Sequence, residues 1–260
     1  MARNEHDKHS GSHSAPPQGE KYYVGLQSDP LAPQSGKPTN LSIIVTEKMT
    51  GSRIGRFDII HDKLMHLVIA SEDLSYFAHV HPKLNDEKIF AIAHTFPVAG
   101  RYKMWVDAKP QGEEQLIKEF RLDVGGGRKP DHEAIPIVAD KNFIKNVAAD
   151  GTRYQVRLKA PEGIKAGQDA EIVFELSDSE GKPIDELEPL MAAGGHCVII
   201  SADAEKFLHV HPVKEVASDC RGGPEIEFRA NFPSPGLYKA WGQFQHRGNI
   251  ITVSFVLEAK

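Results

Sequence analysis

Two short stretches of the chain carry the same histidine pattern. FAHVHP begins at Phe77, and FLHVHP begins at Phe207. In an extended strand, residues two apart point to the same face, so the two histidines of each HVHP motif share one side. Their Cα atoms lie roughly 6.5 Å apart, close enough for two imidazoles to bind one ion. The pattern therefore predicts transition-metal chemistry.

A third histidine precedes each motif at the same spacing. In the first copy it is His66, and the polar segment 71–76 that follows is short enough for a hairpin turn. A turn centred in this segment sets His66 opposite His81 and Val68 opposite His79, and directly opposed residues share a face. The second copy pairs in the same way. The predicted metal ligands are His66, His79, His81, His196, His209 and His211.

The ligand types narrow the choice of metal. Three neutral imidazoles suit Cu(II), Zn(II) or Ni(II), and Cu(I) accepts imidazole and thioether. Met191 precedes the second trio, and its counterpart in the first copy is His61. We therefore expect copper, with zinc as the alternative, and binding that weakens below about pH 6.5 as imidazole is protonated. The competing interpretation is that the histidines are surface or packing groups with no metal site.

The histidine motifs belong to a longer duplication. Residues 66–82 align with 196–212 without a gap, and FPVAGRYKMW (96–105) aligns with FPSPGLYKAW (232–241). A unit of about 100 residues is the size of one β-sandwich. The chain is thus predicted to contain two copies of one domain.

Each copy is predicted to be an immunoglobulin-like sandwich. Short segments rich in Val and Ile are bounded by turn residues, and long helical periodicity is absent. Tyr102 and Tyr238 follow a Pro–Gly turn, as in the tyrosine corner of such sandwiches. Trp105 and Trp241 are predicted to lie in the two cores. The expected fold class is all-β, with two tandem immunoglobulin-like β-sandwich domains.

The segments outside the copies are predicted to be irregular. Residues 1–20 are polar and predicted to be disordered, and GGGRKPDHEAIP (125–136) is typical of a linker. His6, His9 and His13 in the tail can capture metal loosely, or are simply part of a polar tail or a cloning remnant. The predicted organisation is a tail at 1–20, a first domain at 21–124, a linker at 125–150 and a second domain at 151–260.

Composition and motifs exclude several classes of function. The net charge of −5 offers no basic surplus for nucleic acid. No apolar run reaches the ~20 residues of a membrane span, and the first residues lack the apolar segment of a signal peptide. Nucleotide-binding loops and nucleophile motifs are absent, so we expect no enzyme activity. Cys197 and Cys220 can be free thiols or a bridge.

The two long motifs resemble a known group of bacterial domains. HLVIASEDLSYFAHVHP and HCVIISADAEKFLHVHP, each followed by FPxxGxYKxW, resemble the YtkA-like and FixH-like immunoglobulin-type domains. The resemblance covers both copies. It implies a β-sandwich, a periplasmic or cell-surface location, a role in copper or heavy-metal trafficking or resistance, and a metal-efflux or cell-envelope partner. The alternative is a non-catalytic structural or interaction module of the envelope.

Overall fold

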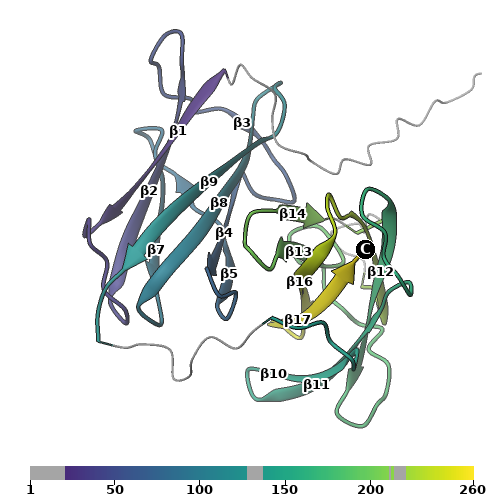
Figure 1. Ribbon diagram of the computed structural model, residues 1–260. Coiled ribbons are helices and arrows are strands. Elements are labelled where there is room, and N and C mark those ends of the chain that lie inside the picture. The colour runs from purple at the N-terminus through teal and green to yellow at the C-terminus, as the bar shows by residue number, and fades with distance from the viewer. Residues whose placement is uncertain (1–20, 128–136, 211, 214–220) are drawn as a thin grey trace, which may run out of the picture.

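The part of the chain that the structure describes consists of β-strands and loops (Figure 1). A computed structural model describes residues 21–127, 137–210, 212–213 and 221–260. The predicted tail at 1–20, with its three histidines, and the predicted ligand His211 lie outside these ranges. No helix in the described ranges is long and apolar enough to cross a membrane.

The first repeat forms two sheets. One has the strand order β1-β2-β7-β6, and the other has the order β3-β8-β4-β5, with β9 also paired to β8. The strands are β1 (Tyr22–Asp29), β2 (Pro38–Glu47), β3 (Phe57–Asp58), β4 (Met65–Ser71), β5 (Phe77–Val80), β6 (Lys83–Leu84), β7 (Phe90–Thr95), β8 (Gly100–Pro110) and β9 (Leu116–Val124).

The second repeat has the same plan. Its sheets have the orders β10-β11-β12-β15 and β14-β13-β16-β17. The strands are β10 (Ile144–Ala149), β11 (Thr152–Lys159), β12 (Asp169–Asp178), β13 (His196–Ser201), β14 (Phe207–Val210), β15 (Glu225–Asn231), β16 (Gly236–His246) and β17 (Asn249–Ala259). The β13-β14 hairpin is the counterpart of β4-β5.

Strand β10 lies inside the range 125–150 that the sequence predicts as a linker. It pairs antiparallel with β11, and Val147 and Ala149 pack against the second core. The apolar side chains of this segment thus gain a buried surface that a linker would not offer. The second domain begins earlier in the structure than the sequence predicts.

Each repeat buries its own core between its two sheets, which confirms the two predicted sandwiches. The tyrosine corners are also confirmed. Tyr102 Oη donates a hydrogen bond to the Val98 carbonyl, and Tyr238 Oη donates one to the Ser234 carbonyl, each at 2.8 Å. These bonds hold the turn that begins β8 and β16.

A third apolar core lies between the two repeats. Trp105 stacks on Phe207 with ring centroids 5.0 Å apart, and Trp241 stacks on Phe77 at 4.8 Å. The sequence-based prediction that the two tryptophans lie in the sandwich cores is therefore wrong. Their positions on the strands face the other repeat. The buried members of this core are Val68, Ala70, Leu74, Trp105, Val198, Ile200, Ala204 and Trp241.

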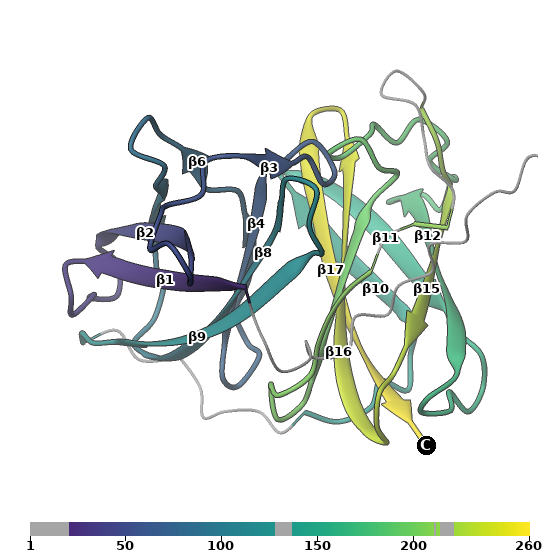
Figure 2. The same cartoon turned by 90° about the horizontal axis from the view of Figure 1, so that it is seen from above.

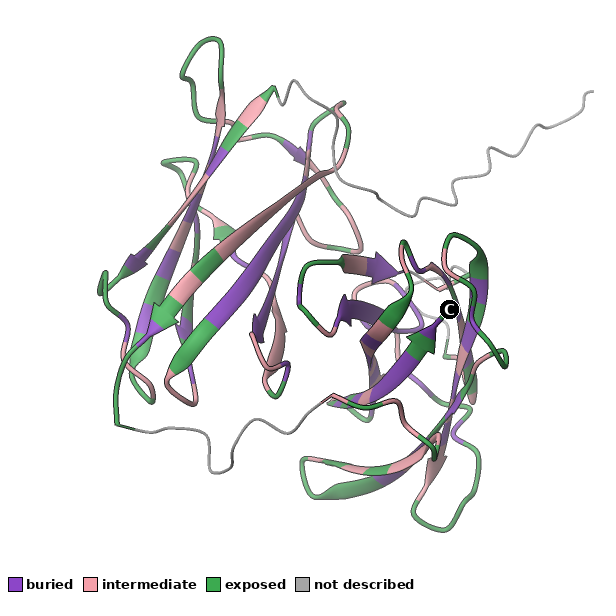
Figure 3. Cartoon of the chain, viewed as in Figure 1, coloured by how far each residue is buried: buried purple, intermediate pink, exposed green. Residues whose placement is uncertain are grey.

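The contact between the repeats has approximate twofold symmetry. Lys103 Nζ donates to the Ala204 carbonyl, and its counterpart Lys239 Nζ donates to the Leu74 carbonyl, each at 2.8 Å. Every residue of β4 and β13 is buried, because one face of each strand lines its own core and the other lines the core between the repeats. The two sandwiches lie side by side in Figure 2, and Figure 3 colours buried residues purple. The faces that carry the histidines therefore meet each other.

Candidate metal centre

The hairpin register brings the histidines onto one face as predicted. Val68 pairs with His79 in the first hairpin, and Val198 pairs with His209 in the second. On the other side of β4, His66 pairs with Asp107 of β8. Opposed residues share a face, so the imidazoles and this carboxylate point together out of the sandwich.

The structure gathers the described histidines of both repeats into one cluster. The sequence predicted one site on each hairpin, but the repeats dock through the faces that carry those sites. The ring of His209 lies 5.1 Å from the rings of both His66 and His79, across the contact. His196 lies 5.6 Å from His79, and His81 lies 4.9 Å from both His66 and His79. Five of the six predicted ligands are therefore together, and His211 is outside the described residues.

Three of these side chains have the spacing of a metal site. His66, His79 and His209 each offer one ligand atom, and these atoms lie within 4.8 Å of one another. A tetrahedral ion with bonds of ~2.0–2.1 Å needs nitrogens about 3.4 Å apart. The 3.0 Å separation of His66 Nδ1 and His79 Nε2 is already that short. The ligand nitrogen of His209 lies within 4.8 Å of the other two and would move closer to bind the same ion.

Hydrogen bonds on the outer nitrogens set the tautomers of the three rings. His66 Nε2 donates to the Ile60 carbonyl at 2.9 Å, and His209 Nδ1 donates to Asp107 Oδ2 at 3.0 Å. His79 Nδ1 donates to Gln243 Oε1 at 3.1 Å. In a neutral ring, the other nitrogen then carries a lone pair. Those lone pairs lie on the inner side, where an ion would bind.

The oxygen partners match the usual surroundings of metal-bound histidine. A ligating imidazole generally donates its second N–H to a carboxylate or carbonyl, which orients the ring and raises its basicity. Asp107 is fully buried, and its other oxygen accepts a hydrogen bond from Gln115 Nε2 at 2.6 Å. Asp107 and Gln243 occupy equivalent places in the two repeats, so the symmetry is broken by one negative charge.

Burial favours the neutral form of four of the clustered histidines. Burial, together with repulsion from the neighbouring imidazoles, lowers the pKa of His79 and of His81 to about 3. Burial also lowers the pKa of His66 and His196. The sequence-based expectation of weaker binding below about pH 6.5 applies to exposed imidazole. For these four histidines the neutral, ligating form persists at lower pH.

The same shifts predict how the stability of the metal-free protein depends on pH. An unfolded histidine has a pKa near 6.5, so between about pH 6.5 and 3 the unfolded chain binds more protons than the folded one. The free energy of unfolding should therefore fall as the pH falls through this window. Urea midpoints measured with a chelator present would show it. The variant His79→Asn, His81→Asn should have a shallower pH profile, and an equally steep profile would contradict the assignment.

Sequence reasoning missed two residues near the cluster, Asp107 and Gln243, and named a third, His61, only as the counterpart of Met191. Asp107 follows Trp105 by two positions, and Gln243 follows Trp241 by two. Strand alternation therefore puts each of them on the same face as the tryptophan of its own repeat. The ring of His61 lies 5.4 Å from that of His196 in the other repeat. The equivalence of His61 and Met191 was visible in the sequence, but its approach to the second repeat follows from the docking.

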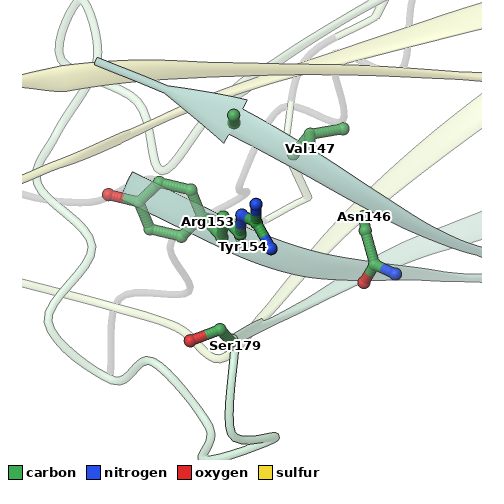
Figure 4. A pocket seen from close by; sticks show the side chains of 6 residues that line it. Asn146, Val147, Arg153, Tyr154 and Ser179 are labelled. Carbon is green, nitrogen blue, oxygen red and sulfur yellow. The ribbon is translucent and has the colours of Figure 1, made fainter. Parts of the chain in front are cut away.

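Other candidate features lie away from the cluster. Cys197 is a buried free thiol whose pKa is raised by burial, and it belongs to the second core, on the opposite strand face from His196. A pocket of about 320 Å³ lies beside the β10-β11 hairpin (Figure 4). Its lining residues are Asn146, Val147, Ala148, Arg153, Tyr154 and Ser179.

Comparisons with known proteins give a family and remote structural likeness. A family model described as "Domain of unknown function (DUF8832)" matches residues 17–126 and again 146–260. No curated protein matches the sequence. Among solved structures, the Escherichia coli adhesin FdeC is 12% identical, with a TM-score of 0.29, over 91% of this chain and 64% of that one.

Two further solved structures are similarly remote. A Salmonella alpha-2-macroglobulin reacted with methylamine is 10% identical, with a TM-score of 0.32, over 94% of this chain and 17% of that chain. Domains 4 and 5 of the S-layer protein SbsC are 13% identical, with a TM-score of 0.25, over 91% of this chain and 97% of that one. The present chain thus spans less than two thirds of the adhesin and macroglobulin structures.

Proposed function

We propose that this chain, which belongs to the DUF8832 family and contains two copies of its domain, is a non-enzymatic metal-binding protein whose ion lies between the copies. One observation carries the proposal. Three imidazoles from two repeats converge, and hydrogen bonds on their outer nitrogens leave the inner nitrogens with lone pairs. His66 Nδ1 and His79 Nε2 lie 3.0 Å apart, close enough to share one cation or one proton.

Copper is the proposed metal, with zinc as the alternative. Three neutral imidazoles bind either ion well. The resemblance of the HVHP repeats to YtkA-like and FixH-like domains favours copper. On the same resemblance we propose that the protein is exported, acts in metal trafficking or resistance, and meets a metal-efflux or cell-envelope protein.

A metal titration tests the proposal. The full-length chain with His6→Asn, His9→Asn and His13→Asn would be titrated with Cu(II), Cu(I) and Zn(II) against a competing chelator, so that the tail does not contribute. We expect at least one ion to be held far more tightly than surface adsorption allows. Weak binding of all three ions would favour the competing function, a structural or interaction module in which the cluster is a polar part of the contact between repeats.

The substitution Asp107→Asn should weaken metal binding without removing a ligand. Asp107 makes His209 a more basic ligand and partly compensates the charge of the ion, and loss of such a partner typically costs 10–100-fold in affinity. We expect a loss of about that size in the same titration. Glu119→Gln on the neighbouring strand serves as a matched control for removal of one negative charge. Equal affinities of the two variants would contradict the role of Asp107.

A further inference from the structure

Two imidazoles beside the proposed trio come close to each other from different repeats. His61 lies in a two-residue turn closed by hydrogen bonds between Ile60 and Lys63. Its ring centroid is 5.4 Å from that of His196, with the rings nearly perpendicular. His61 is partly exposed, whereas His196 is fully buried. This pair thus reaches from the surface to the interior.

The tautomer of His196 suits it for ligation on the inner side. His196 Nε2 donates to the Leu190 carbonyl at 3.0 Å, the counterpart of the bond from His66 to Ile60. Nδ1 of the neutral ring then carries the lone pair. The ring of His196 is 5.6 Å from that of His79 and 5.9 Å from that of His209. An ion at this pair would therefore lie next to the trio.

The turn itself does not require an imidazole at position 61. The equivalent turn of the second repeat has Met191 and Ala192 in the same left-handed conformation, with φ of 52° and 55° against 45° at His61. Both turns are closed by the same pair of backbone hydrogen bonds. The backbone conformation of the turn therefore does not explain why a histidine occupies position 61. Its counterpart is a thioether, the other neutral side chain that binds copper.

We propose that His61 and His196 form a second, weaker metal position, through which the ion passes between solvent and the trio of His66, His79 and His209. This inference rests on the proposed function. Two protein ligands leave the ion with open coordination positions, so it exchanges more readily than at a filled site. The buried carboxylate of Asp107 contacts His209 of the trio, so its negative charge lies at the tight site. A cation at His61 and His196 would lie farther from this negative charge, and the cation in the trio would repel it.

The test compares His61→Asn with Asp62→Asn in the chain that lacks the tail histidines. Asparagine is tolerated at positive φ, so the turn should persist in both variants. Stoichiometry would be measured by copper titration against chelators of graded strength, and the loading rate of the tight site by stopped flow. Parent and Asp62→Asn chains should bind a tight and a weaker equivalent. His61→Asn should lose the weaker equivalent, keep the tight one and load it more slowly.

The outcomes separate this inference from the proposed function. One tight equivalent in the parent chain, or an unchanged second equivalent and loading rate in His61→Asn, overturns the second position and leaves the trio intact. Absence of any tight equivalent in the parent overturns both. Loss of the weaker equivalent in His61→Asn, with the tight affinity retained, supports the second position, because a purely structural role of His61 would not remove one ion selectively.

Discussion

A chain carrying His79→Asn and His209→Asn is expected to lose tight metal binding while keeping its fold. The substitutions remove one ligand from each repeat, so they leave a single imidazole of the trio. Changes to residues that merely orient a ligand cost 10–100-fold in affinity, and removal of two ligands should cost more than about 100-fold. Chelator competition with Cu(II), Cu(I) and Zn(II) would measure the loss.

The chain offers a matched control in two buried histidines away from the cluster. His94 contacts the hydroxyl of Tyr76 at 3.1 Å, and His246 contacts that of Tyr154 at 3.3 Å. His94→Asn together with His246→Asn removes the same number of buried imidazoles. This control should be destabilised to a comparable extent yet retain the tight ion. If both double variants bind metal alike, the cluster is not the site.

Much of each hairpin could be predicted from the sequence. The polar segment 71–76 fixes the turn, and a strand alternates faces, so the pairing of Val68 with His79 follows from local chemistry. The tyrosine corner also follows from a short motif, because its hydrogen bond spans four residues. Local rules were sufficient wherever both partners lie in one hairpin or turn.

The docking of the repeats could not be predicted in the same way. It depends on two surfaces that meet through a third core, and no local rule says that two similar faces bury each other. One signal was present: HCVIIS is apolar on both faces apart from its ends, which is typical of a strand buried on both sides. A strand buried on both faces must contact something outside its own sandwich. That interpretation would have suggested that Trp105 and Trp241 lie between the domains.

The composition of the candidate site follows from this docking. Asp107 contacts His209 and Gln243 contacts His79, and both contacts cross between repeats. Spacing along the chain shows that Asp107 and Gln243 share a face with the histidines of their own repeat. The histidines that they contact, however, belong to the opposite repeat. The sequence thus identifies five of the clustered histidines as candidate ligands. It does not identify Asp107 and Gln243, which orient two of them.

The substitution Trp241→Ala should be among the most damaging single changes to the contact between repeats. Trp241 is 5% exposed and stacks on Phe77, with an angle of 12° between the rings. Truncation of a buried aromatic to alanine costs about 3–5 kcal/mol. We expect a loss of that size in the free energy of unfolding measured by urea denaturation, and about the same for Trp105→Ala, which is buried to a similar degree.

Trp241→Ala should also weaken metal binding, although Trp241 is not a proposed ligand. His66 and His79 belong to one repeat and His209 to the other, so the contact between repeats sets the effective concentration of the third ligand. Phe228→Ala is the matched control, because Phe228 is fully buried within the second sandwich core. It should cost similar stability and leave metal affinity unchanged at temperatures where the protein stays folded.

The two readouts together decide where the ion is held. A loss of affinity in Trp241→Ala but not in Phe228→Ala would mean that the ion needs both repeats. If Trp241→Ala loses stability and keeps full affinity, the ligands must come from one repeat. The trio His66, His79 and His81, whose rings lie within 5.1 Å of one another, would then be the site. That result would restore the arrangement the sequence predicted, with a metal site complete on a single hairpin.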